Sequence, residues 1–137
     1  MSRENVEIVR RVYAAAARRD SETVLALYDP QVEWDNSAGP FSDLFGRRVY
    51  RGHEGLRIFF HEYSETWENL EESLEELIDA GDHVVSVQST QARGRASGVE
   101  VGWKHNAGVW TVEDGKIIRV AWFGSRAEAL ETAGLSE

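Results

Sequence analysis

Three residues in the sequence have side chains suited to moving a proton: Asp35, Tyr13 and His105. Asp35 ends the alternating segment 31–35, and a carboxylate at an apolar pocket mouth has its pKa raised by desolvation, which suits a general base. Tyr13 lies on the predicted buried stripe of a helix, where a phenol can donate to a developing oxyanion. His105 alternates with Trp103, so a pocket on that face would pair His105 with Asp35 as base and orienting carboxylate.

Each of these residues also has a structural interpretation. Asp35 can bond the backbone of the loop that follows it. The ring of Tyr13 can pack in the core while its hydroxyl bonds a backbone acceptor. His105 can lie on the surface or in an interface. At the level of the sequence both interpretations stay open.

Signatures of other chemistries are absent from the sequence. It has no cysteine, no HExxH motif and no cluster of His and Asp at ligand spacing, so we expect no metal ion. It also lacks a nucleophile elbow and the glycine-rich motifs GxxxxGK[ST] and GxGxxG. We therefore expect no nucleotide or other cofactor.

The elements that must position these residues are helices first and strands afterwards. Apolar residues at helical spacing indicate helices over 3–19 and 56–67, and a short helix between them that ends near 28–30. In the second half, β-branched and aromatic residues indicate strands at 83–90, 99–112 and 117–123, the last two joined by an Asp-Gly hairpin turn.

One segment is ambiguous, because the leucines of residues 70–79 keep helical spacing while the turn at 79–82 needs a preceding strand. The order of the other elements nevertheless indicates the α+β class. We expect a single domain over 1–137, with three main helices on one face of a curved, mostly antiparallel sheet and a short C-terminal helix.

Six motifs, in their order and spacing, resemble those of the SnoaL-like proteins. They are Tyr28-Asp29-Pro30-Gln31-Val32-Glu33-Trp34, Tyr50-Arg51-Gly52-His53-Glu54-Gly55, and the segments 79–85, 94–100, 114–117 and 127–130. The SnoaL-like proteins belong to the superfamily of ketosteroid isomerase, scytalone dehydratase and nuclear transport factor two-like proteins. The resemblance implies a cone-shaped barrel with a deep apolar pocket between sheet and helices, a strand at 73–79, and a homodimer joined through sheet faces.

The resemblance also implies roles for single residues. Asp35 lies where ketosteroid isomerases carry the carboxylate that moves a proton beside a carbonyl, and Tyr13 lies near their oxyanion-binding tyrosine. A His105–Asp35 pair resembles the dehydratases. The sequence departs from the pattern at Gly124, where the cyclases and epoxide hydrolases carry an Asp, and at 107–108, where the isomerases carry a second acid. Epoxide hydrolysis is therefore disfavoured.

Large rings are numerous for so short a chain, and five are predicted to line the pocket: Trp34, Phe59, Tyr63, Trp103 and Trp122. Such a wall with one or two polar groups suits a neutral polycyclic or terpenoid-like ligand. We expect the protein to bind a small apolar or aromatic molecule, with or without proton transfer of the isomerase, cyclase or dehydratase type. The alternative is a non-catalytic ligand-binding or protein-interaction module with a degenerate site.

The charge of the chain limits its partners. Its 15 basic and 24 acidic residues give a net charge of −9, which argues against a nucleic-acid or anionic-membrane partner. Nine acids and no Lys or Arg lie between Arg57 and Arg93, forming either a solvated face or an acidic rim that repels anionic ligands. No apolar run approaches the ~20 residues that span a bilayer. Because the N-terminus lacks the apolar region of a signal peptide, we expect a cytoplasmic protein.

Overall fold

The computed structural model describes residues 2–135. Along the chain these form α1 (Ser2–Ala17), α2 (Ser21–Ala26), β1 (Tyr28–Ala38), β2 (Val49–Arg51), α3 (Gly52–Thr66), β3 (Trp67–Asp79), β4 (His83–Gly94), β5 (Glu100–Glu113), β6 (Lys116–Phe123) and α4 (Arg126–Thr132). The strands form one curved, unclosed sheet in the order β2-β1-β6-β5-β4-β3. Strands β1 and β6 are parallel, and the other neighbours are antiparallel. The α+β prediction is confirmed, with a mixed sheet.

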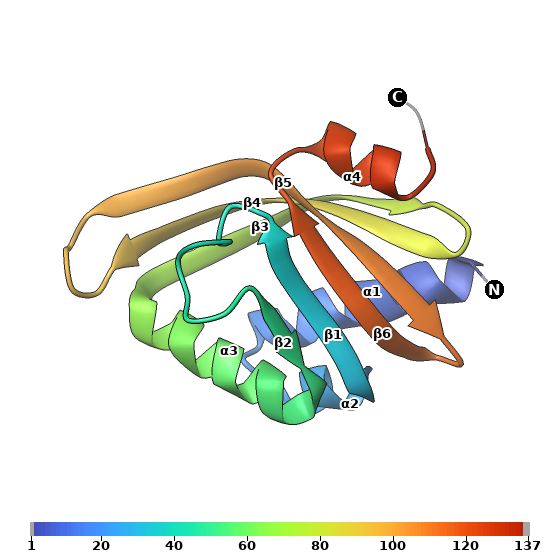
Figure 1. The fold of residues 1–137 in the computed structure, drawn as a ribbon, viewed down its shortest axis with the longest axis horizontal. Helices are drawn as coiled ribbons and strands as arrows, with labels where there is room; N and C mark the ends of the chain where they lie inside the picture. The colour runs from blue at the N-terminus through green and yellow to red at the C-terminus, as the bar shows by residue number, and fades with distance from the viewer. Residues whose placement is uncertain (1, 136–137) are drawn as a thin grey trace.

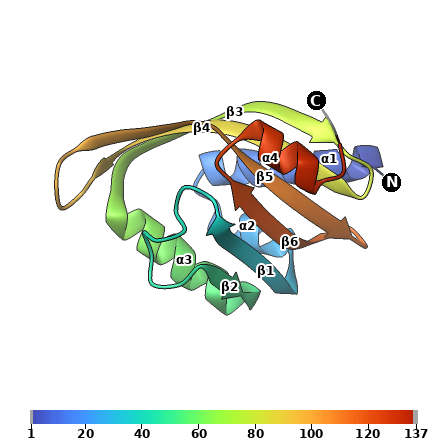
Figure 2. The same ribbon diagram turned by 45° about the horizontal axis from the view of Figure 1, so that its top comes forward.

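Helices cover both faces of this sheet (Figure 1, Figure 2). The face that packs against α1, α2 and α3 is called the inner face here, and it holds the larger core cluster. The short helix α4 packs on the opposite, outer face, where Ala129 and Leu130 contact a smaller cluster that includes Val85 and Val109. The C-terminal helix is thus present as expected, but it lies across the sheet from the other three.

Residues 67–79 form a strand, as the resemblance implied, and not a helix. Strand β3 pairs with β4 along its length, and this pairing overrides the helical spacing of its leucines. It is one free edge of the sheet and carries six acids: Glu68, Glu71, Glu72, Glu75, Glu76 and Asp79. Charged side chains on an edge strand discourage pairing with a second chain.

Strand β1 begins at Tyr28, inside the segment where a helix was expected to end. Tyr28 pairs with Ile117 of β6 and its ring is fully buried, so sheet pairing and core packing decide this segment. The predicted Asp-Gly turn is formed by Asp114 and Gly115, which have φ angles of 51° and 77°. Within residues 2–135, no helix is both long enough and apolar enough to cross a membrane.

Candidate functional site

A cavity of about 300 Å³ lies between the inner face of the sheet and the helices α1, α2 and α3. Nine aromatic residues contribute to its wall: Tyr13, Tyr28, Trp34, Phe41, Phe59, Phe60, Tyr63, Trp110 and Trp122. The ring of Trp34 lies 5.1 Å from that of Phe59 and 5.6 Å from that of Trp122, measured between centroids. The cavity is therefore mainly apolar, and its polar groups are few enough to consider one by one.

Four of the five aromatic residues expected to line a pocket lie in this wall, and Trp103 does not. The Trp103 ring packs edge-on against Phe41 and Trp67, with centroid distances of 4.8 Å and 5.4 Å. Because Phe41 is part of the wall, Trp103 supports the cavity from behind without reaching its interior.

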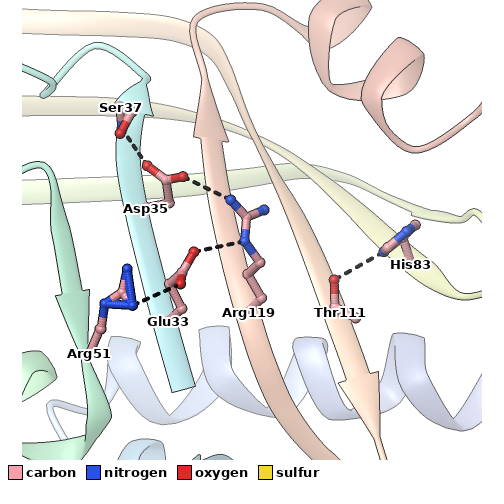
Figure 3. A network of polar contacts seen from close by, with 7 residues as sticks. All are labelled: Glu33, Asp35, Ser37, Arg51, His83, Thr111 and Arg119. Atoms are coloured by element: carbon pink, nitrogen blue, oxygen red, sulfur yellow. Dashed lines mark hydrogen bonds and ion pairs between the residues drawn. The ribbon is translucent and has the colours of Figure 1, made fainter. Parts of the chain in front are cut away.

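Asp35 lies on the outer face of the sheet, away from the cavity (Figure 3). Its Oδ2 accepts a hydrogen bond from Arg119 Nη2 at 2.8 Å, and its Oδ1 accepts one from the backbone N–H of Ser37 at 2.8 Å. Glu33 lies on the same face and pairs with Arg119 and Arg51 at 3.1 Å and 3.4 Å. The base role expected for Asp35 required its carboxylate to face the cavity, and that condition is not met.

Strand alternation explains this placement. Successive side chains of a strand point to opposite faces. Trp34 and Asn36 both line the cavity, so Asp35 between them must face outward. Its bond to the backbone of Ser37 is the structural interpretation that the sequence had left open.

His105 also lies outside the cavity, on the surface. Trp103 pairs with Thr90 and Asn106 pairs with Gln88, so β5 uses one residue more than β4 over this interval. The extra residue makes a β-bulge, and His105 has a φ of +60° there. Its Nδ1 lies 3.1 Å from Glu75 Oε1. Because the bulge shifts the alternation, Asn106 faces the cavity in place of His105.

Tyr13, in contrast, lines the cavity, and its hydroxyl belongs to a hydrogen-bond network. The phenol oxygen lies 2.6 Å from Gln88 Oε1 and 2.9 Å from Ser86 Oγ. An amide oxygen only accepts, so Tyr13 donates its single proton to Gln88 and the Ser86 hydroxyl donates to Tyr13. Ser86 Oγ in turn accepts from Trp110 Nε1 at 2.8 Å.

The network continues from Gln88 to Glu72, a carboxylate in the cavity wall. Gln88 Nε2 lies 3.4 Å from Glu72 Oε2 and 3.2 Å from Thr90 Oγ1, so both ends of this amide are engaged. The Tyr63 hydroxyl donates to the same Glu72 Oε2 at 3.0 Å. Within the described residues, no side chain donates to the second oxygen, Oε1.

Burial shifts the pKa of these groups. Glu72 is exposed to solvent as a residue, whereas protein atoms pack around its carboxylate group, and this partial desolvation raises its pKa. Burial likewise raises the pKa of Tyr13 and Tyr63, so both phenols stay protonated and keep their hydrogen bonds to Gln88 and Glu72. Glu72 is therefore the wall carboxylate whose pKa is raised.

The second wall carboxylate, Asp20, has a structural task. It caps helix α2 by accepting from Thr23 N at 3.2 Å, and its bonds to Thr23 hold its pKa below the usual range. Over residues 2–135, no group of three or more His, Cys, Asp or Glu side chains is placed to hold a metal ion.

Three polar atoms of the wall have no hydrogen-bond partner. They are Asn36 Nδ2, Trp122 Nε1 and Asn106 Oδ1, and their residues are 1%, 8% and 3% exposed. In all, five buried side-chain N or O atoms of the described residues are unpaired, and the other two lie outside this wall. Unpaired buried polar atoms are costly and uncommon, so their gathering around one cavity makes it the candidate site.

The wall residue Gln88 and its neighbours Ser86 and Thr90 were not predicted from the sequence. They alternate with Val85, Val87 and Ser89 in β4, a pattern that also fits a strand with one solvated face. The alternation was thus a signal that two faces differ in polarity. It could not show that the polar face turns toward the helices.

Comparisons with known proteins identify a family model that matches the chain and solved structures that are similar to it. A family model described as a SnoaL-like domain matches residues 9–120, and no curated protein matches the sequence. The structure is similar to that of an NTF2-like protein from Burkholderia thailandensis, with 31% identity, 87% of this chain and 88% of that chain covered, and a TM-score of 0.76. It is also similar to a putative SnoaL-like polyketide cyclase from Mesorhizobium loti, with 22% identity, 85% and 96% coverage and a TM-score of 0.67. For TerC co-crystallized with polyporic acid, the identity is 23%, the coverage 96% and 98%, and the TM-score 0.76.

Proposed function

Because the chain belongs to the SnoaL-like domain family, we propose that it binds a small, neutral aromatic molecule in the cavity of its inner face. The observation that carries the proposal is the cavity wall, in which nine aromatic residues surround a few unpaired polar atoms. Apolar walls with a small number of placed polar groups are typical of ligand sites. TerC, which shares the fold, was co-crystallized with polyporic acid.

The size of the cavity and the charges around it limit the class of ligand that it can bind. A volume of about 300 Å³ lies at the lower end of the range for ligand pockets, so one or two fused rings fit better than a larger polycyclic system. Glu72 lies in the cavity wall and belongs to β3, the edge strand that carries six acidic residues. These charges disfavour an anionic ligand.

The test compares two alanines of α1. Both are exposed, but Ala16 lies at the rim of the cavity wall and Ala14 lies outside it. A bicyclic probe such as 2-acetylnaphthalene should quench the tryptophan fluorescence of the wild type and of Ala14→Phe. In Ala16→Phe the added ring narrows the cavity at its rim, and the quenching should be strongly reduced. Equal binding by the two variants would place the probe elsewhere.

Proton transfer is a second candidate function, favoured by the geometry of Glu72. One carboxylate oxygen is held by Tyr63 and Gln88, while the other is open to a ligand. A fixed carboxylate with a raised pKa suits a general base. Glu72 would take a proton from the carbon beside a carbonyl, the electron pair would pass to the carbonyl oxygen, and the proton would return to carbon.

Hydrogen exchange tests this without a known substrate. In D₂O, the methyl protons of 2-acetylnaphthalene should be replaced by deuterium faster with the protein than without it. Glu72→Gln should slow this exchange by about 10²–10⁴-fold. Asp35→Asn, on the outer face, should leave it unchanged. Equal rates for Glu72→Gln and the wild type would rule Glu72 out as the base.

The open cavity with its unpaired atoms supports ligand binding over a pure interaction module. The homodimer implied by the family resemblance and the cytoplasmic location stay predictions. Light scattering of the purified protein measures the oligomeric state.

A further inference from the structure

The three unpaired atoms of the wall carry information about the ligand's polar groups. Two of these atoms can act only as hydrogen-bond donors. Trp122 Nε1 can only donate. Asn36 Oδ1 accepts from Trp34 Nε1 at 3.1 Å, which fixes the orientation of the amide and leaves Nδ2, a donor, as the unpaired atom.

The two donors come from neighbouring strands of the sheet. Asn36 and Trp122 follow the Asp35–Ala121 pair of β1 and β6, in an interval where the register shifts before Ala38 pairs with Phe123. The Trp34 indole lies beside both, because its Nε1 donates to Asn36 Oδ1 and its ring centroid lies 5.6 Å from that of Trp122. Both side chains line the cavity, and neighbouring strands lie about 4.8 Å apart. One acceptor atom of a ligand can therefore lie between them.

Asn106 supplies the third group, from the next strand. It pairs with Gln88 across β4 and β5, but both ends of the Gln88 amide are already engaged, so Gln88 cannot satisfy it. Its free amide can accept, or donate after rotation. Gly108 pairs with Trp122 and carries no side chain, which lets the indoles of Trp110 and Trp122 pack close to its backbone.

We propose that the ligand bears a neutral carbonyl-type oxygen that accepts from Asn36 Nδ2 and Trp122 Nε1, with a second polar group at Asn106. This inference rests on the proposed function and names the ligand class: an aromatic ketone, aldehyde or quinone. A carboxylate is disfavoured, because Arg19 is the only basic residue in the wall among the described residues and Glu72 shares the cavity.

The test compares two probes of nearly the same shape. 2-Acetylnaphthalene has a carbonyl where 2-ethylnaphthalene has a methylene group, and 2-naphthoate carries a charge. The wild type should bind the ketone about tenfold more tightly than the hydrocarbon, since only the ketone satisfies the buried donors. 2-Naphthoate should bind the least tightly of the three.

Matched tryptophan variants assign this preference to the cavity. Trp122→Phe should lose most of the ketone preference while keeping its affinity for 2-ethylnaphthalene. Trp67 Nε1 is also buried and unpaired but lies outside the wall, so Trp67→Phe should keep the preference. Asn106→Leu, a second wall variant, should also keep the preference, because 2-acetylnaphthalene has no second polar group to reach Asn106.

The outcomes separate the two proposals. If the wild type binds the ketone and the hydrocarbon equally, the carbonyl inference is overturned while ligand binding stands. If Trp67→Phe loses the preference and Trp122→Phe keeps it, the assignment of the donors is overturned. If neither probe binds, the proposed function fails and this inference fails with it.

Discussion

The Tyr63 hydroxyl donates a hydrogen bond to Glu72 Oε2 at 3.0 Å, and this contact holds a carboxylate of the edge strand β3 against helix α3. Gln88 Nε2 reaches the same oxygen from β4. The Glu72 carboxylate is thus held by two elements, α3 and β4, through one of its oxygens.

The first prediction concerns the pH dependence of stability. Because the folded-state pKa of Glu72 is raised, ionisation of Glu72 removes stability as the pH rises from the unfolded pKa of about 4.3 through the folded value. Glu72→Gln can keep both hydrogen bonds to this position and has no charge to bury. Its stability relative to the wild type should therefore increase with pH, as thermal unfolding between pH 4 and pH 8 would show. A difference that is constant or falls with pH would contradict the raised pKa.

The second prediction uses two amides that are cross-strand neighbours. Asn106 has an unpaired oxygen, whereas Gln88 bonds Tyr13, Thr90 and Glu72. Asn106→Leu should raise the free energy of unfolding by up to about 1–3 kcal/mol, because it removes an unsatisfied buried group. Gln88→Leu should lower it by a similar amount, because it leaves partners unpaired. Urea denaturation measures both, and two changes of the same sign would refute the assignment.

The third prediction concerns Gly108, on the inner face of β5. A Cβ at this position would lie 3.0 Å from Trp110 Nε1 and 3.0 Å from Trp122 Cζ3. Gly108→Ala should therefore displace these indoles and cost about 1–3 kcal/mol in chemical denaturation. As a control, Gly124→Ala, at an exposed position with open surroundings, should cost much less. Equal stability of the two variants would contradict the close contacts of Gly108 with Trp110 and Trp122.

The fourth prediction concerns the buried phenol of Tyr13. Tyr13→Phe keeps the ring but leaves Gln88 Oε1 without its donor, which should cost about 1–3 kcal/mol of stability. The control is Asp35→Asn, which weakens a partly exposed ion pair with Arg119 and should cost less than about 1 kcal/mol. Denaturation of the two variants side by side gives the comparison. A smaller cost for Tyr13→Phe than for Asp35→Asn would contradict the network.

Much of the fold follows from local patterns in the sequence. The apolar stripe of the first helix predicted α1, in which Val9 is buried and Tyr13 lines the cavity, and the Asp-Gly turn joins β5 and β6. Strand β3 needed the family resemblance, because its leucines keep helical spacing and only pairing with β4 makes it a strand. Local propensity is a weak guide where tertiary pairing decides.

The site was harder to predict, for two physical reasons. Trp34 and Asp35 are consecutive in a strand, so they could not both face the pocket, and burial of the indole turns the carboxylate outward. His105 was assigned by alternation, which a bulge interrupts without any marker such as glycine at that position. Gln88 and Asn106 reach the cavity because the sheet curves around it, and the sequence does not show this curvature.

The most direct measurement is the structure of the protein crystallised with 2-acetylnaphthalene. We predict that the naphthalene rings lie in the cavity between the inner face of the sheet and the helices, with the carbonyl oxygen within hydrogen-bond distance of Asn36 Nδ2 and Trp122 Nε1. A complex in which the ketone lies on the outer face, or in which the cavity stays empty while the probe binds elsewhere, would contradict it.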